Sequence, residues 1–548
     1  MKRTIPLVGA VFLVVLAVLV VGGTADSLRS TGRYVLAGLP ILVVIGVMIR
    51  LRWGGQRAGP LGWMVGLLVA VLAFGLTFDA LWVSQLKGLL LSAFVLAVLW
   101  PALLLYNLVN QAGGIGAITH ALERLIPDRG LLLVVTAWAF SGMLEGLAGF
   151  GLPIAIVAPI LVGLDISPIM AVAAVAVGHA WAVTFGDMGV IFQTLVGIVD
   201  VDAARLAPIA ALMLGGACLA CGLATAHLLR QGRHWLAVVV LALLMGGAQY
   251  GLAVSGLTPL AALGAGLVGI VGGVAVGQAP GLMRAGRPRL NRSASGTDLD
   301  DPPVLTPPLL ATLLSYGALT VLLAAITLIH PLNTALKAVA WKMSFPRVTT
   351  RDGFVTPAGT GQVLRPLVHP GTAILLIALA SYVLYRRARL CQSGDLRRAA
   401  AATWRSAMPA SIGVVAMVGL STLMDHAGMT VKLAKAASDA VGTAFPVVSP
   451  LVGMLGAFAT GSNNNSNVLF APLQQSVALL LAISPRLLLA AQTTGGSLGS
   501  MIAPAKIIVG CSTLGLRGRD GEVLRVTLPY GIAIGLAAGI LALLLAAF

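Results

Sequence analysis

The chain has 548 residues, of which 58% are hydrophobic and only 10% are charged. Soluble domains are roughly 45–50% apolar and about 25% charged, so the composition excludes an ordinary soluble protein and indicates a polytopic membrane protein. The formal net charge of +17 does not indicate a nucleic-acid partner, because the basic residues lie in short segments between apolar runs, as the positive-inside rule describes.

Apolar runs long enough to cross a bilayer follow one another along the chain, and we expect an all-α polytopic membrane protein with about 12–14 transmembrane helices. The first run, at 5–22, is interpreted as a transmembrane helix, because no small-residue cleavage site precedes the next run. Further spans are expected at 34–49, 61–78, 88–109, 206–229, 235–253, 257–279 and 309–329, with another ending at Arg387 and the last ones between 407 and 548.

One hydrophilic stretch divides the apolar sequence. Residues 284–308 are rich in Arg, Ser, Asp and Pro. We therefore expect an N-terminal transmembrane half over 1–283, a hydrophilic linker over 284–308 and a C-terminal transmembrane half over 309–548. Each half is predicted to hold one broken-helix repeat.

Basic residues predict how the chain lies in the membrane. The segments 50–57, 230–233 and 386–405 are rich in Arg and alternate with the apolar runs. Basic loops face the cytoplasm, so these segments and the N-terminus are predicted on the cytoplasmic side, with the C-terminus outside. Residues 115–128 are expected to form an interfacial helix, and 330–370 a long polar loop.

The stretch 144–153 departs from ordinary lipid-facing sequence. It contains the carboxylate of Glu145, then Pro153, and three glycines at Gly146, Gly149 and Gly151. Irregular backbone at membrane depth is tolerated only where it lines a cavity or is buried in protein. An ionisable side chain at such a place is a functional candidate. The stretch therefore predicts a broken helix at a binding site.

A second polar interruption lies in the other half, at 460–467. Two broken segments in corresponding positions indicate the binding site of a transporter. The amides and hydroxyls of this segment supply donors and acceptors for a small carboxylate, and helix N-termini at the breaks supply backbone N–H groups. Shorter interruptions are expected at 185–189 and 503–504. The predicted substrate-binding residues in this segment are Ser462, Asn463, Asn464, Asn465, Ser466 and Asn467.

The two halves share an order of features that indicates an internal repeat. The order is the same in both halves, and the loop assignment gives helix 88–109 and its counterpart 407–424 opposite directions, so we predict an inverted repeat. The matched pairs are Ala139-Phe140 with Ala457-Phe458, Ala158-Pro159 with Ala471-Pro472, Ser167-Pro168 with Ser484-Pro485, and Gly178 with Gly495.

Three side chains are candidates for proton coupling. Glu145 is the first, because a carboxyl at membrane depth can bind and release a proton. Asp187 and His179 are eight residues apart in the sequence and form an alternative titrating pair, since histidine changes charge near neutral pH. Lys506 and two arginines in a loop, Arg517 and Arg519, are possible contacts for a substrate anion.

Four segments together resemble the L-lactate permease family: 144–156, 460–467, 493–502 and 515–522. The resemblance implies an inner-membrane secondary carrier that imports lactate or related 2-hydroxymonocarboxylates with protons. The wider superfamily implies paired re-entrant hairpins and elevator-type movement. It also implies a substrate-binding role for Thr493, Thr494, Gly495 and Gly496. His179, Asp187, Asn463–Asn465 and Lys506 depart from the family's pattern.

Several alternatives stay open at this point. Coupling to Na⁺ instead of H⁺, and a different substrate such as glycolate or a longer carboxylate, fit the same sequence features. A non-transporting membrane subunit of an energy-coupling complex is an alternative of another class. The sequence has no Walker A motif and no metal-ligand cluster, so we expect no enzyme activity, cofactor or metal. The expected partners are a small carboxylate and the lipid bilayer, with a homodimer left open.

Overall fold

The computed structural model describes residues 26–51, 53–149, 151–278, 305–516 and 519–547. The span predicted at 5–22 and most of the predicted linker lie outside these residues. Among the described residues, 11 helical segments are long and apolar enough to cross a membrane, by length and composition. The all-α polytopic fold predicted from the composition is confirmed.

The first two of the four helices at the start of the described chain form a hairpin. The turn before the third of them falls at Gly75, where φ is +62°, and Thr77 caps that helix by accepting a hydrogen bond from the Ala80 N–H at 3.4 Å. This helix extends over 34 residues, well beyond the predicted 88–109, because the sequence before residue 88 remains helix-compatible. The elements are α2 (Asp26–Leu51), α3 (Gly55–Ala73), α4 (Phe78–Gln111) and α5 (Gly114–Leu125).

The first predicted break is confirmed as an interruption of helix. One helix ends at Leu147 and the next begins at Leu152, after Gly151 adopts a φ of +85° that glycine tolerates without strain. A second interruption follows at 186–189. The elements are α6 (Arg129–Val135), the π-helix η1 (Thr136–Phe140), α7 (Ser141–Leu147), α8 (Leu152–Gly163), α9 (Pro168–Gly178), the 3₁₀ helices η2 (Ala180–Phe185) and η3 (Asp187–Gly189), and α10 (Val190–Val199).

The middle of the chain is a series of long helices followed by the predicted polar loop. This loop contains a short helix and two antiparallel strand pairs, β1 with β4 and β2 with β3. The elements are α11 (Ala203–Leu228), η4 (Gly232–His234), α12 (Trp235–Val254), η5 (Thr258–Leu260), α13 (Ala261–Gln278), α14 (Pro307–Leu328), α15 (His330–Lys337), β1 (Ser344–Phe345), β2 (Val348–Thr349), β3 (Val355–Thr356), β4 (Gly359–Thr360) and α16 (Pro370–Arg387).

The second half also contains two interruptions at the predicted places. The break in the Asn-rich segment is confined to Gly461 and Ser462, and the asparagines themselves are helical. The second interruption lies between Gly499 and Pro504. The elements are α17 (Asp395–His426), α18 (Met429–Val441), η6 (Gly442–Ala444), α19 (Phe445–Thr460), α20 (Asn463–Leu480), α21 (Pro485–Gly499), α22 (Pro504–Thr513) and α23 (Asp520–Ala546).

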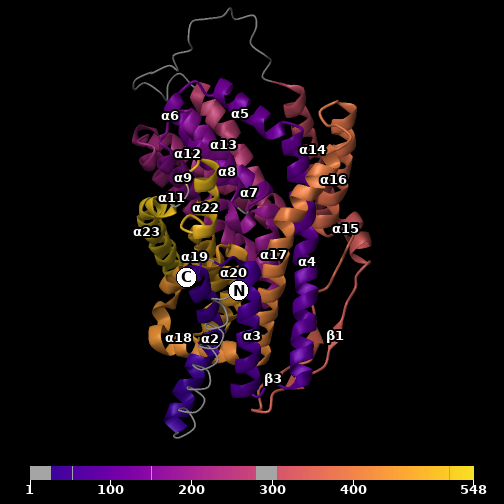
Figure 1. Ribbon diagram of the computed structural model, residues 1–548, viewed down its shortest axis with the longest axis vertical. Coiled ribbons are helices and arrows are strands. Elements are labelled where there is room, and N and C mark those ends of the chain that lie inside the picture. Colours follow the sequence, from indigo (N-terminus) through magenta and orange to yellow (C-terminus); the bar gives the residue numbers. More distant parts are fainter. Residues whose placement is uncertain (1–25, 52, 150, 279–304, 517–518, 548) are drawn as a thin grey trace, which may run out of the picture.

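The two longest helices, α4 and α17, pack side by side and are antiparallel (Figure 1). Near one end, Asn107 Nδ2 donates to Thr403 Oγ1 at 3.1 Å. Near the other end, Lys87 Nζ lies 3.3 Å from His426 Nε2. The opposite directions are those that the inverted repeat requires of these two helices. The repeat itself stays a prediction.

In each half of the chain, the helix that follows the broken segment crosses another helix at close range, and a glycine lies at the crossing. A Cβ atom added to Gly178 would lie 2.0 Å from the Ala137 carbonyl oxygen, and one added to Gly495 would lie 1.8 Å from the Pro450 carbonyl oxygen. Both glycines therefore allow backbone-to-backbone contact, of α9 with η1 and of α21 with α19. These are the two glycines that the sequence comparison of the halves paired with each other.

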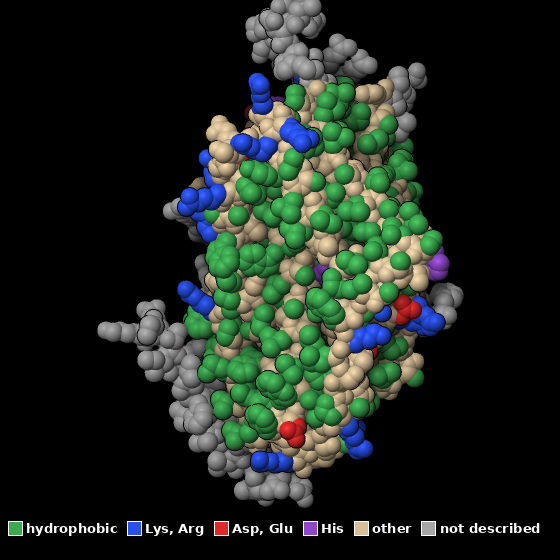
Figure 2. Space-filling view, turned by 90° about the vertical axis from the view of Figure 1, so that its right-hand side faces the viewer, with side chains coloured by type: hydrophobic (Ala, Val, Ile, Leu, Met, Phe, Trp, Pro, Cys, Tyr) green, Lys and Arg blue, Asp and Glu red, His purple; other side chains and the backbone are tan. Residues whose placement is uncertain are grey.

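The surface is consistent with a membrane environment. Figure 2 shows a face covered mainly by hydrophobic side chains, with charged side chains mostly toward its edges. Large apolar side chains such as Leu243, Val321 and Leu72 are more than half exposed, which in water would be costly and in lipid is favourable. Many of the buried polar residues, among them Glu145, Asp187 and the asparagines at 463–465, lie at the breaks inside the helix bundle.

Candidate functional site

A buried ion pair joins the first break to the second half of the chain. Lys506 Nζ donates to Glu145 Oε1 at 3.0 Å, and the side chains are 7% and 1% exposed. Glu145 belongs to α7, immediately before the first break, and Lys506 to the first turn of α22, after the interruption at Pro504. The sequence predicted Glu145 at the site but did not predict that Lys506 is its partner.

His179 completes this cluster and has a defined tautomer. Its Nδ1 lies 2.8 Å from the Val175 carbonyl oxygen. A carbonyl can only accept, so Nδ1 carries the hydrogen and a neutral imidazole has its lone pair on Nε2. That Nε2 lies 3.4 Å from Lys506 Nζ and accepts from the ammonium. His179 is thus a neutral hydrogen-bond acceptor for Lys506.

Asp187 also belongs to this cluster, although no continuous helix connects it to His179. The predicted two turns of helix from His179 do not form, because α9 ends at Gly178 and a 3₁₀ helix follows. Asp187 adopts a φ of +50° and its Oδ1 accepts a hydrogen bond from the Gly149 N–H. A Cβ added to Gly149 would lie 2.6 Å from Glu145 Oε1 and 2.9 Å from Asp187 Oδ2, so only glycine fits between the two carboxylates.

The unwound backbone of the first break therefore contacts protein carboxylates. The three predicted glycines have different surroundings. The Gly149 N–H donates a hydrogen bond to Asp187. A Cβ on Gly146 would lie 2.5 Å from the Leu263 backbone nitrogen, so Gly146 allows α7 to pack closely against α13. Gly151 supplies the positive φ at which α8 begins.

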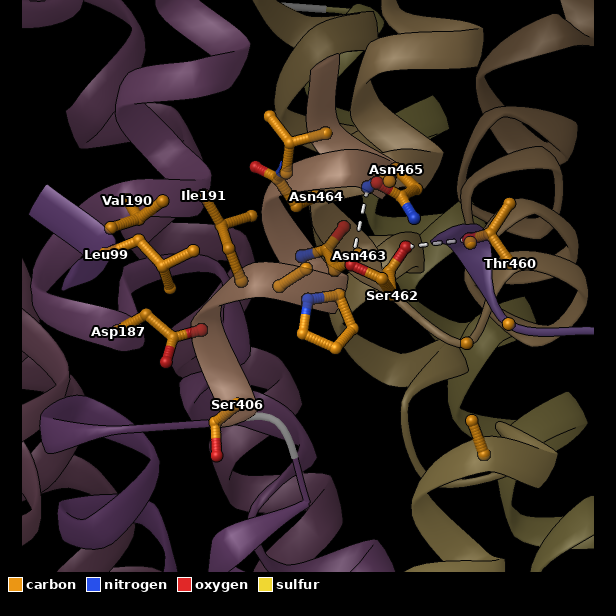
Figure 3. A pocket seen from close by; sticks show the side chains of 18 of the residues that line it. Leu99, Asp187, Val190, Ile191, Ser406, Thr460, Ser462, Asn463, Asn464 and Asn465 are labelled. Carbon is orange, nitrogen blue, oxygen red and sulfur yellow. Dashed lines mark hydrogen bonds between the residues drawn. The ribbon is translucent and has the colours of Figure 1, made fainter. Parts of the chain in front are cut away.

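The second break is organised by Ser462. Gly461 has a φ of +71°, and the Ser462 hydroxyl then caps α20 by accepting from the Asn465 N–H at 3.4 Å. Thr460 Oγ1 donates to the Ser462 carbonyl oxygen at 3.0 Å (Figure 3). Because the serine caps the helix, the asparagines that follow project from its first turns rather than from an unwound segment.

A buried polar network connects the two breaks. Asn463 Nδ2 donates to Thr184 Oγ1 at 3.1 Å and to the Thr493 carbonyl oxygen at 3.3 Å, and Asn467 Nδ2 donates to Thr493 Oγ1 at 2.9 Å. Ser497 Oγ donates to the Ala180 carbonyl oxygen at 2.6 Å. Sequence reasoning predicted the asparagines and Thr493 but missed Thr184, a single hydroxyl in an apolar segment, and Ser497, which lies in the segment 493–502.

The remaining predicted residues of α20 and α21 lie behind this network. Ser466 Oγ donates to the Gly453 carbonyl oxygen at 2.7 Å. A Cβ on Gly496 would lie 1.9 Å from Asn463 Oδ1, so Gly496 provides the space that this amide occupies. Thr494 is fully buried, and its hydroxyl has no hydrogen-bond partner among the described residues.

A cavity of about 440 Å³ lies where the two breaks meet. This is within the range of about 300–1,000 Å³ that is usual for small-molecule sites. Figure 3 shows Asp187 on one side of it and Asn463, Asn464 and Asn465 on the other. Its lining also includes Glu145, Lys506, Thr460, Ser462, Val190, Ile191 and Leu99, with residues of α3 and α17.

The mouth of this cavity is basic. Gln56, Arg405 and Ser406 line it and are exposed, so the cavity opens at the side that holds the segments 50–57 and 386–405. An anion entering there passes the Arg405 guanidinium before it reaches the asparagines. Sequence reasoning missed Arg405 as a lining residue, because it was part of a basic stretch that the positive-inside rule already explained.

Comparisons with known proteins found a matching family model, similar permeases and a solved structure. A family model described as L-lactate permease matches residues 33–288 and 307–548. The L-lactate permease of Salmonella typhi is 27% identical over 543 residues, covering 92% of this chain and 94% of that protein. The glycolate permease GlcA of Escherichia coli strain K12 is 26% identical over 541 residues, with the same coverage. The solved structure of the Alcanivorax borkumensis YdaH transporter has a TM-score of 0.45 and 18% identity, covering 82% of this chain and 84% of that one.

Proposed function

Because the chain belongs to the L-lactate permease family, we propose that it carries L-lactate or a related small 2-hydroxymonocarboxylate into the cell together with a proton. The observation that carries this proposal is the cavity between the two breaks, which combines a basic mouth with a buried cluster of two carboxylates and one ammonium. The plasma membrane is the proposed location, with the mouth of the cavity on the cytoplasmic side.

The second break has the chemistry to bind the substrate carboxylate. The N-terminus of α20 faces the cavity, and the helix is 18 residues long, so free N–H groups and the positive end of the helix dipole are directed at an anion. The amides of Asn464 and Asn465 line the same wall and can bind the 2-hydroxyl. This recognition does not require the Lys506 ammonium, which is already paired with Glu145.

Charge counting supports proton coupling at the first break. With both carboxylates ionised, Glu145, Asp187 and Lys506 have a net charge of −1, since His179 is neutral. An uncompensated buried charge is costly, and one proton removes it. Glu145 has Lys506 as its counter-ion, whereas no cation among the described residues lies within ion-pair distance of Asp187. We therefore assign the coupled proton to Asp187, with Glu145 and Lys506 as its electrostatic surroundings.

Sodium coupling is the second candidate, and one observation favours it. The oxygens Asn463 Oδ1, Asn467 Oδ1 and Thr494 Oγ1 are buried and have no hydrogen-bond partner among the described residues. Neutral oxygens are suitable ligands for a hard cation. Replacing sodium by choline on both sides of a vesicle separates the two candidates: proton coupling predicts unchanged uptake.

Two relatives support the proposed chemical class of the substrate. L-lactate and glycolate are both 2-hydroxymonocarboxylates, and permeases for each are similar to this chain to nearly the same degree. Uptake of both acids by proteoliposomes that contain only this chain would also exclude a non-transporting subunit, which has no activity by itself. The elevator-type movement and a homodimer stay predictions.

Replacing Asn465 with leucine is expected to abolish L-lactate uptake while leaving membrane insertion normal. The substitution removes a cavity amide and puts a bulky apolar side chain in its place. The control is Asn333→Leu, the same exchange in α15, where the amide donates to the Ile326 carbonyl oxygen far from the cavity. Wild-type uptake by Asn465→Leu proteoliposomes would remove the second break from the binding site.

The proposed orientation predicts a labelling pattern. Cysteines placed at Thr349 and at Ser393 are expected to react with a membrane-impermeant thiol reagent from opposite sides, Thr349→Cys from outside cells and Ser393→Cys only after permeabilisation. Both positions are exposed, and the four native cysteines are buried and therefore slow to react. The opposite pattern would reverse the orientation.

A further inference from the structure

A second cavity lies at the other end of the helices that form the first. Its volume is about 450 Å³. Residues 405–414 of α17 line the first cavity and residues 421–426 the second, and α20 contributes Asn463–Asn465 to the first and Pro472 and Gln475 to the second. The end of α10 and the loop residues 360–365 complete it. The two cavities therefore lie one beyond the other along α17 and α20, and the part of the helix bundle between them is called the barrier below.

The second cavity repeats the lysine–histidine pair of the first. Lys87 Nζ lies 3.3 Å from His426 Nε2, as Lys506 Nζ lies 3.4 Å from His179 Nε2. His426 Nδ1 lies 2.8 Å from the Thr422 carbonyl oxygen, so Nδ1 carries the hydrogen and Nε2 accepts from the ammonium. A neutral histidine thus orients a charged lysine in both places.

The two lysines differ in their carboxylate partner. Lys506 is paired with Glu145, whereas no carboxylate of the described residues lies within ion-pair distance of Lys87. The Lys87 ammonium also lies over the Phe345 ring, 5.5 Å from its centroid, and the carboxylates of Asp425 and Asp200 act on it electrostatically without forming an ion pair. Lys87 therefore retains hydrogen-bond donors and a positive charge that face a polar cavity.

The remaining charged groups lie at the rim. Asp200, Arg365 and Asp425 line the cavity and are exposed, whereas Lys87 is half-buried and His426 buried. The three rim groups have a net charge of −1, and the Lys87 ammonium brings the charge of the cavity lining to zero, so the attraction for an anion is local to Lys87 and Arg365. The amide of Gln362 and the hydroxyl of Ser421 also line the cavity and can bind a hydroxyl group.

We propose that this second cavity is a binding site for a small 2-hydroxymonocarboxylate on the side of the barrier opposite to the first cavity. The carboxylate binds to the Lys87 ammonium, and His426 holds that ammonium in place. The proposal rests on the proposed function for its substrate class. The proposal adds a second site, which the substrate occupies before or after it passes through the barrier.

The test is protection of a cysteine at the rim. Thr360 lines the second cavity and is exposed, and the native cysteines are buried, so Thr360→Cys provides one reactive thiol. In purified full-length protein, L-lactate is expected to slow the modification of this thiol by a small thiol reagent. Adding Lys87→Gln is expected to raise the L-lactate concentration for half protection by about tenfold or more, because a charged hydrogen-bond donor is lost. Lys87→Arg should keep protection within a few-fold.

Two control variants make the result specific. Lys432 also has its ammonium over an aromatic ring, 5.6 Å from the Tyr34 centroid, but it lines neither cavity. Lys432→Gln is therefore expected to leave protection unchanged. Asn465→Leu, which disables the first cavity, is also expected to leave protection of the Thr360→Cys thiol unchanged. If this variant loses protection, binding in the first cavity causes the protection, and the proposal is overturned.

The outcomes separate this proposal from the proposed function. If the Thr360→Cys protein transports L-lactate but L-lactate does not protect its thiol, the second site is overturned and the transport function stands. The same conclusion follows if the thiol is protected equally with and without Lys87→Gln. If L-lactate is neither transported nor protective, both are overturned. Transport with protection that depends on Lys87 supports both.

Discussion

Replacing Lys506 with methionine is expected to lower the free energy of unfolding by about 3–5 kcal/mol and to abolish transport, because it leaves an uncompensated buried charge. The lysine and Glu145 form a pair at 3.0 Å in which both side chains are almost fully buried. Methionine fills a similar volume, so the loss of charge and not of packing dominates the effect. Denaturation of the detergent-solubilised protein and uptake into proteoliposomes measure the two quantities.

A double substitution separates the charge from the fold. Glu145→Gln with Lys506→Met removes both members of the pair, and such exchanges are often nearly neutral in stability. The double variant is therefore expected to regain most of the stability that Lys506→Met loses, without regaining transport. Lys435→Met, at an exposed position of α18, is the control and should change neither quantity. Equal losses in the single and double variants would show that Lys506 acts through packing alone.

Replacing Asp187 with asparagine is expected to abolish uphill accumulation of L-lactate while exchange of external for internal L-lactate continues. Asparagine keeps an oxygen that accepts from the Gly149 N–H but cannot bind and release the proton. With one proton per substrate, a gradient of one pH unit supports about tenfold accumulation in the wild type. The variant should reach a ratio of about one, measured with radiolabelled L-lactate in proteoliposomes.

Glu145→Gln identifies the alternative proton site. This variant also removes one buried negative charge, but it leaves Lys506 without its counter-ion, so it should be less stable than Asp187→Asn. If Asp187→Asn accumulates L-lactate normally and Glu145→Gln retains exchange without accumulation, the coupled proton belongs to Glu145. The sequence alone favoured that assignment, because it did not place Lys506 beside the carboxylate.

The positions of the helix breaks could be predicted from the sequence because their causes are local. Gly151 and Gly461 have a positive φ at the ends of helices, and Pro504 begins α22, so each marks an interruption by its own backbone properties. Their placement in apolar sequence led to the prediction that both breaks belong to one site, and residues of both line one cavity. The extent of the second break was overestimated, since the Ser462 cap allows helix from Asn463 onward.

The contacts at the site could not be predicted, because they join residues that are distant in the sequence. Lys506 was noted as unusual, yet no local pattern indicates a partner 361 residues earlier. Thr184 and Arg405 were missed for a related reason, since a lone hydroxyl and a loop arginine have common explanations in any membrane protein. Their roles follow from the crossing of α17 and the two broken segments, which is a property of the fold.

The distance in sequence between Glu145 and Lys506 has a consequence for biosynthesis. At about 5–20 residues per second, the 361 residues that separate them take about 20–70 seconds to synthesise. During this interval the ribosome and the insertion machinery hold a first half whose carboxyl has no counter-ion, and an acidic side chain at the centre of a membrane helix costs about 3 kcal/mol on insertion scales. The nascent chain must keep Glu145 protonated or hydrated until the second half arrives. Truncated or stalled chains that end before Lys506 therefore expose a polar defect that membrane quality-control proteases can recognise.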